Sequence, residues 1–122
     1  MSPLPQPHAN GPFRPGAFAI VTLANPREKV WGVILELSVH GLSMRGIDLA
    51  AFEDLVASIK TGDPFTSGVV FFPMHRVERV ELDLPEGGIP SMCQRFEEKT
   101  GKRAEQVLAA DSTPPDAETV RR

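Results

Sequence analysis

The alternation of apolar and polar residues predicts three strands in the first half of the chain. Residues 17–24 form a short apolar run rich in β-branched side chains, which ends at an Asn-Pro turn signal. Residues 29–38 alternate along a second strand, and residues 42–49 form a third strand after a tight turn. One face of the second strand is expected to carry the apolar residues Trp31, Val33, Leu35 and Leu37.

The period of the apolar pattern changes after the third strand. Apolar residues then recur three or four positions apart, the spacing of one helix face, at Leu49, Phe52, Leu55, Val56 and Ile59. Asp48 is the expected N-cap, and Gly62 follows the last turn as a C-terminal signal. We therefore predict a short helix within residues 48–62.

Two more strands follow this helix. Residues 68–72 are predicted to be a strand that ends at Pro73, since proline cannot donate to a ladder. The last strand is predicted within residues 76–84, with its apolar residues on one face. Val77 is out of phase with those residues, which predicts a tight turn through residues 73–77 before the strand begins.

A second helix is predicted over residues 91–108. Ser91 and Gln94 have the spacing of a capping box, and Gly101 is expected to interrupt or end the first stretch. Together the elements predict a mainly β domain with α, namely a five-stranded SH3-like or OB-like small barrel with an inserted helix and a C-terminal helix. This order of elements favours such a barrel over a sheet of βαβ units.

The ends of the chain are expected to lie outside this domain. Residues 1–15 are rich in proline and are predicted to form a flexible arm. Residues 109–122 cannot bury enough apolar surface to fold and are predicted to be a disordered tail. The folded domain is therefore predicted at residues 16–108.

Composition narrows the classes of function. The net charge of -3 argues against a basic footprint for nucleic acid over the whole domain. One cysteine, Cys93, excludes an internal disulfide and a cysteine-based zinc cage, and it is interpreted as a small apolar residue on a helix. The sequence has no apolar run long enough to span a membrane, and its first residues lack the features of a signal peptide. We expect a cytoplasmic protein without a membrane partner.

Two segments resemble the Sm-like family, and within it the bacterial RNA chaperone Hfq. The stretch FAIVTLANPREKVWGVILELSVHGLSMRG is similar to the first Sm motif, and VVFFPMHRVERV is similar to the second. His75 falls where Hfq has a histidine, whereas Val39, His40 and Met74 stand where Hfq has glutamine, phenylalanine and lysine. The resemblance implies an Sm-like barrel whose RNA-binding residues would be His40, Met74, His75 and Arg76.

Residues 36–41 also resemble a different family, the PilZ domains, which bind cyclic di-GMP. The stretch ELSVHG has the serine and glycine of the second PilZ motif at Ser38 and Gly41. The family's paired arginines would correspond to Arg14 and Arg27, which do not have the family's spacing. This resemblance implies a PilZ-like regulatory barrel, either binding the nucleotide or acting through protein–protein contacts.

Catalytic and metal sites have no comparable support in the sequence. The three histidines lack metal-ligand spacing, and no nucleophile elbow, oxyanion loop or phosphate-binding loop occurs. We therefore expect no enzyme activity, no cofactor and no metal. For His75, a structural role in which its ring bonds a backbone carbonyl is favoured over a ligand role. In the stretch HRVERVE, cross-strand ion pairs are favoured over phosphate contacts.

The predicted strand at residues 68–72 suggests how the domain is used. Small barrels must manage their exposed edge strands, and the stretch GVVFF has no charge to discourage pairing. We predict a non-enzymatic binding or assembly module that forms homo-oligomers, or binds a protein partner, through this strand. RNA binding and the PilZ-like role remain the two more specific alternatives.

Overall fold

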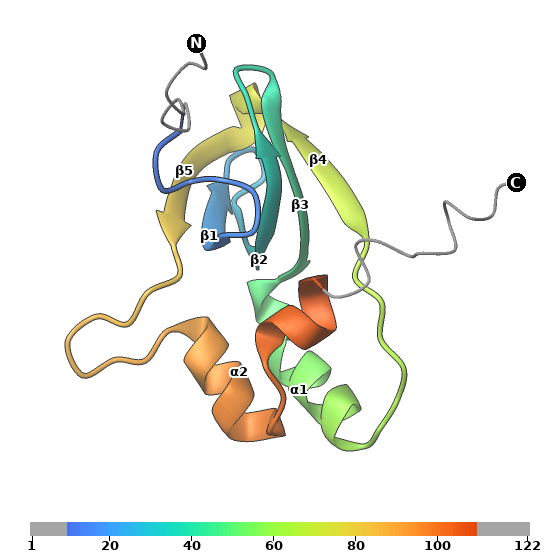
Figure 1. Ribbon diagram of the computed structural model, residues 1–122. Coiled ribbons are helices and arrows are strands. Elements are labelled where there is room, and N and C mark those ends of the chain that lie inside the picture. Colours follow the sequence, from blue (N-terminus) through green and yellow to red (C-terminus); the bar gives the residue numbers. More distant parts are fainter. Residues whose placement is uncertain (1–9, 110–122) are drawn as a thin grey trace, which may run out of the picture.

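The computed structural model describes residues 10–109, and these residues form one antiparallel sheet with helices at one end (Figure 1). The sheet order is β4-β3-β2-β1-β5. The mixed α/β class and the number of strands are as predicted. The strands are β1 Phe18–Leu23, β2 Glu28–Leu37, β3 Gly41–Asp48, β4 Val69–Pro73 and β5 Val77–Leu82. The helices are α1 Phe52–Lys60 and α2 Met92–Thr100, with shorter helical turns η1 Leu49–Ala51, η2 Met74–Arg76 and η3 Glu105–Ala109.

The sheet is curled, because its two edge strands are consecutive in the chain. Four strand spacings would separate the edges of a flat sheet by about 19 Å, whereas the chain from Pro73 to Val77 reaches at most about 14 Å. The three residues of η2 make this connection as a 3-10 turn. The predicted turn at residues 73–77 is therefore confirmed. Within the described residues no ladder joins β4 to β5.

Two β-bulges set which side chains share a face. The register of β2 on β3 shifts between Ile34 and Glu36, so Leu35 is an extra residue in β2. Leu37 consequently packs with Ile34, and the prediction that Leu37 shares the face of Trp31 is wrong. The register of β5 on β1 skips Glu78, which explains why Val77 is out of phase with the rest of its strand.

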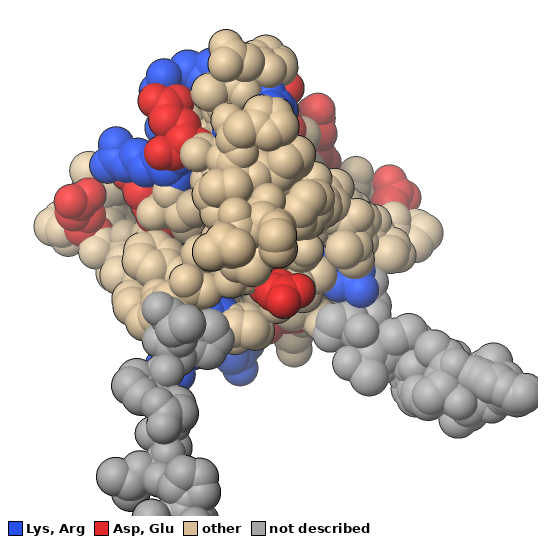
Figure 2. All heavy atoms as spheres, turned by 90° about the horizontal axis from the view of Figure 1, so that it is seen from above, with Lys and Arg blue, Asp and Glu red and all other residues tan. Residues whose placement is uncertain are grey.

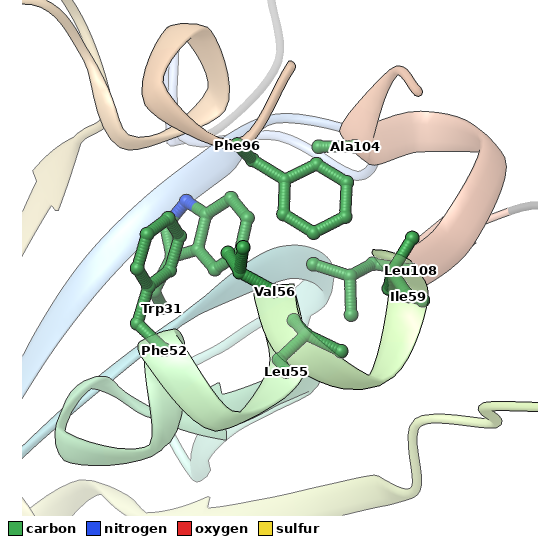
Figure 3. Packing of buried hydrophobic residues seen from close by; sticks show 8 residues of the cluster. All are labelled: Trp31, Phe52, Leu55, Val56, Ile59, Phe96, Ala104 and Leu108. Carbon is green, nitrogen blue, oxygen red and sulfur yellow. The ribbon is translucent and has the colours of Figure 1, made fainter. Parts of the chain in front are cut away.

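The two faces of the sheet carry separate hydrophobic clusters. The first cluster lies between the sheet and the helices, and in it Phe52 and Phe96 pack around Trp31 (Figure 3). The second lies on the opposite face. Its buried members are Ala19, Val21, Leu23, Val30, Ile34, Leu42 and Met44. Strand alternation accounts for this division, since Val30 and Trp31 are consecutive and enter different clusters.

The predicted cap residues lie at or near the ends of the two helices. The Asp48 side chain accepts a bond from the amide of Ala50 and caps η1, which leads directly into α1, whose own N-cap is Ala51. The capping box of Ser91 and Gln94 is present at the start of α2. Gly101 ends α2 with a φ of 77°, a left-handed conformation that favours glycine.

The predicted arm lies partly within the described residues. Phe13 packs against the second cluster, and the Asn10 amide donates to the carbonyl of Leu37 at 2.7 Å. Residues 1–9 of the arm and residues 110–122 of the tail lie outside the described residues. No helix within residues 10–109 is long and apolar enough to cross a membrane.

Candidate functional site

Strand β4 forms one edge of the sheet and, among residues 10–109, pairs only with β3 (Figure 1). Three of its side chains are exposed although they are apolar: Val69 is 57% exposed, Val70 38% and Phe71 55%. Phe72, by contrast, packs into the second cluster. The strand is therefore held to the sheet by one ladder and one inward aromatic ring, while Val69, Val70 and Phe71 stay exposed.

The pairing of β4 with β3 fixes which backbone groups face the free edge. The amide of Met74 donates to the carbonyl of His40 at 2.9 Å, directly beyond the pair Gly41 and Pro73. Because hydrogen-bonded and non-hydrogen-bonded pairs alternate in an antiparallel ladder, Phe72 and Val70 also direct their backbone groups toward β3. The backbone groups of Val69, Phe71 and Pro73 point away from β3, toward the free edge of the sheet. Proline, which lacks the N–H, thus occupies an outward position.

The apolar surface of β4 continues onto the turns at the end of the sheet. In the turn between β2 and β3, Val39 is 84% exposed, and Met74 in η2 is 36% exposed. Figure 2, which looks down on this end, shows a broad uncharged surface across the middle, with charged residues gathered along its margins. Exposed apolar side chains beside an uncharged surface are typical of an interaction site.

The structure brings together only some of the predicted RNA-binding residues. His40 and Met74 are neighbours through their backbone hydrogen bond. His75 is exposed, and its ring makes no hydrogen bond to any described residue, so the carbonyl bond expected for it is absent. Arg76 is directed elsewhere. Its guanidinium donates to the carbonyls of Ala24 and Pro26 at 2.7 and 2.9 Å, and it lies 3.6 Å from the carboxylate of Glu28.

The residues suggested by the PilZ resemblance have mainly local roles in the structure. Ser38 and Gly41 close the turn between β2 and β3 by bonding each other's backbone, and the Ser38 hydroxyl accepts from the amide of His40. Arg27 lies 3.6 Å from the carboxylate of Glu78. Arg14 is exposed, and its carbonyl accepts from the amide of Ala17.

The opposite edge of the sheet has a different surface. Strand β5 carries two ion pairs, Arg27 with Glu78 and Arg79 with Glu81. Glu78 is also the bulged residue of this strand. Charges and bulges are two of the devices that discourage an edge strand from pairing with another chain. The expected cross-strand ion pairs are present only in part. The pair of Arg79 with Glu81 lies within β5. Glu78 pairs with Arg27 in the turn between β1 and β2, and Arg76 pairs with Glu28 at the start of β2.

Sequence reasoning missed the contacts of Asp83, which follows β5. Its carboxylate accepts from the backbone amides of Met92 and Cys93 at 2.7 and 2.8 Å, and from the indole Nε1 of Trp31 at 3.0 Å. The first amides of α2 are thereby satisfied, and a negative charge is placed at the helix N-terminus. Trp31 is 52 residues away in the chain, so no local pattern signals this contact.

Cys93 is not prepared to act as a nucleophile. Burial, followed by the neighbouring carboxylate of Asp83, raises the pKa of its thiol well above the ordinary value. The thiolate, which is the reactive form, is therefore disfavoured. This agrees with the interpretation of Cys93 as a small apolar residue, since it packs against the first cluster.

Two shallow clefts lie away from β4. One, of about 470 Å³, runs between the end of β5 and the start of α2, and its lining includes Asp83, whose carboxylate is already engaged. The other, of about 450 Å³, lies beside the end of α1 and is lined in part by Phe65 and Lys102. No group of three or more His, Cys, Asp or Glu residues within the described part of the chain is arranged to hold a metal ion.

Comparison with known proteins gives no family for this chain. No family model, no curated protein and no solved structure matches it.

Proposed function

We propose that this chain is a non-enzymatic binding and assembly module that accepts a protein strand along the free edge of β4. The observation that carries the proposal is the outward edge of this strand. It presents the backbone groups of Val69 and Phe71, flanked by exposed apolar side chains and without a charged residue in the strand. A strand added there would gain main-chain hydrogen bonds and bury apolar surface on both sides.

The curl of the sheet supports a small barrel as the finer description of the fold. The edges β4 and β5 converge on η2, as in the SH3-like and Sm-like folds that the sequence resembles. In such a barrel the second cluster would be the interior, because its members lie on the face opposite the helices. The proposed strand would then extend the barrel wall at its open seam.

RNA binding remains the main alternative, and the charges near β4 favour it less. Arg76, the one arginine among the predicted RNA-binding residues, is bound to the turn between β1 and β2 and to Glu28. The end of the sheet seen in Figure 2 is largely uncharged across its middle, and β4 itself carries no charged residue. Phosphate contacts depend on free Lys and Arg groups, so an uncharged surface suits a polypeptide partner better.

Amide hydrogen exchange tests strand addition directly. The probe is a synthetic peptide of residues 67–74 flanked by lysines, added to the full chain. We expect new protection at the amides of Val69 and Phe71, which face outward. The amides of Val70 and Phe72 bond to β3 and serve as internal controls, since their exchange should change little.

A titration with labelled oligo-U RNA and with cyclic di-GMP, at two salt concentrations, completes the test. The proposal is supported if neither ligand binds and the peptide protects the amides of Val69 and Phe71 from exchange. Oligo-U affinity that weakens with salt, without protection at β4, would replace it with the RNA-binding function. Binding of cyclic di-GMP would replace it with the PilZ-like function.

A further inference from the structure

We infer that the strand accepted by β4 is β4 of a second copy of this chain, in an antiparallel, two-fold symmetric pair centred on Val70. The inference rests on the proposed function and names its partner. It follows from three features of the molecule: the position of Pro73, the side chains along the edge, and the charges on the opposite edge.

The position of Pro73 selects the register. Outward-facing residues of one copy must oppose outward-facing residues of the other, so a symmetric pair is centred on Val69, Val70 or Phe71. Centring on Val70 places Val69 opposite Phe71 of the second copy, and both residues have an N–H and a carbonyl to exchange. Centring on Phe71 instead places Val69 opposite Pro73, which has no N–H to donate.

The remaining register is less favourable for a different reason. Centring on Val69 would place Phe71 opposite residue 67, before the start of β4, where Ser67 is only 3% exposed. Its hydroxyl donates to the carbonyl of Leu108, and its carbonyl accepts from Arg45. Only the register centred on Val70 therefore builds its ladder from Val69 and Phe71 alone, with each of their N–H groups matched to a carbonyl and each of their carbonyls matched to an N–H.

The side chains along β4 suit this register. Phe71 of each copy would lie directly across from Val69 of the other, and an aromatic side chain facing a β-branched one is a favourable cross-strand pair. All three exposed residues, Val69, Val70 and Phe71, would be covered from the partner's side. Because the strand carries no charge, the two-fold axis brings no like charges together.

The charges on β5 favour this closed pair over a ring. In a ring, β4 of one copy would pair with β5 of the next. That arrangement would place Val69, Val70 and Phe71 beside the ion-paired, bulged strand that carries Glu78, Arg79 and Glu81. The pair of two β4 strands avoids desolvating those charges.

Cysteine crosslinking tests the register, with each cysteine introduced into a Cys93→Ala background. In the pair centred on Val70, the two Val70 positions oppose each other without hydrogen bonds between them, at a Cα separation of about 4.5 Å, which a disulfide can span. We expect Val70→Cys to form a covalent dimer under mild oxidation. Phe71→Cys should do so much more slowly, since its counterpart lies diagonally, roughly 7–8 Å away.

A charge exchange at the same position tests the symmetry. Val70→Lys and Val70→Glu each place like charges together at the two-fold axis, and each should weaken self-association by roughly tenfold or more. An equimolar mixture of the two should restore dimers. Leu84→Lys and Leu84→Glu are matched controls on an exposed apolar residue beyond β5, and they should leave the dimer unchanged.

Light scattering and thermal unfolding provide the readouts. Folded Val70 variants that are monomeric alone and dimeric when mixed support the inference. A wild-type monomer at tens of micromolar, or a crosslink faster at Phe71 than at Val70, overturns it. If the wild type is monomeric while the β4 peptide still protects Val69 and Phe71, self-pairing fails and strand addition stands. If both measurements are negative, the proposed function fails as well.

Discussion

The two edges of the sheet differ in how they meet solvent. Strand β4 exposes three apolar side chains, and Pro73 is the one position on its outward side that cannot donate. Strand β5 carries a bulge at Glu78 and two ion pairs, and Asp83 directly beyond it is tied to α2 and Trp31. The same sheet therefore has one edge that resists pairing and one edge that permits it.

This difference shows that protection of an edge is a property of individual strands. Devices against edge pairing are concentrated on β5, although β4 has the more apolar sequence and the greater need for them. An edge left open while its counterpart is protected directs association to one surface. The predictions below remove or transfer the features that distinguish the two edges.

The largest effect is expected from removing the contacts of Asp83 beyond β5. Asp83→Ala leaves the amides of Met92 and Cys93 and the indole N–H of Trp31 without their acceptor. We expect the free energy of unfolding to fall by about 2–4 kcal/mol, since unsatisfied buried donors are costly. Chemical denaturation measures the loss. A change below about 0.5 kcal/mol would show that water replaces these bonds.

The next effect concerns Arg76, which lies in the turn between the two edges. Arg76→Met removes the bonds to the carbonyls of Ala24 and Pro26, and we expect a loss of about 2 kcal/mol, because the donor is charged and mostly buried. Arg27→Met is the matched control. Its ion pair with Glu78 is exposed, so the loss should stay below about 1 kcal/mol. Equal losses in the two variants would contradict this assignment.

Transferring the character of β4 to β5 should change assembly more than stability. The double variant Arg79→Val with Glu81→Val removes the ion pair of these two exposed or half-exposed residues. We expect a stability change within about 1 kcal/mol, together with species larger than the proposed dimer, because both edges could then pair. Light scattering as a function of concentration measures the size. An unchanged dimer would show that charge is not what protects β5.

The smallest effect is the pH dependence contributed by Cys93. Because its pKa is raised in the folded chain, by burial first and by Asp83 second, the protonated thiol contributes stability at neutral pH. Above about pH 8.5 the unfolded thiol ionises while the folded one does not, so this contribution is lost as pH rises. Denaturation at pH 7 and pH 10 should show a larger decline for the wild type than for Cys93→Ser. Equal declines would remove Cys93 as the cause.

The sequence predicted those parts of the fold that depend on local signals. The capping box at Ser91, the left-handed end at Gly101 and the turn after Pro73 are each specified by a few neighbouring residues. The bulges at Leu35 and Glu78 were not predicted, because an alternation pattern assumes a constant phase and a bulge depends on the partner strand. Val77 alone signalled the second bulge, as a residue out of phase.

The candidate site likewise has some features that the local sequence predicts and others that depend on the folded sheet. The sequence of the five residues of β4 shows that the strand carries no charge, whereas its position at a free edge is a property of the whole sheet. The bonds of Arg76 to the carbonyls of Ala24 and Pro26, and those of Asp83 to Trp31, join residues 50 or more positions apart. The sequence therefore identified the strand without showing which of the neighbouring side chains are already engaged.

The central strand β2 also determines how the molecule comes apart. Val30 and Trp31 are adjacent in the chain, yet one enters each hydrophobic cluster. Withdrawing β2 from either cluster necessarily withdraws it from the other, so the two clusters melt as one cooperative unit despite lying on opposite faces of the sheet. Strand β4 is held by a single ladder and by Phe72 and contributes no buried member to either cluster, so we expect its local opening to leave the buried members of that unit in place.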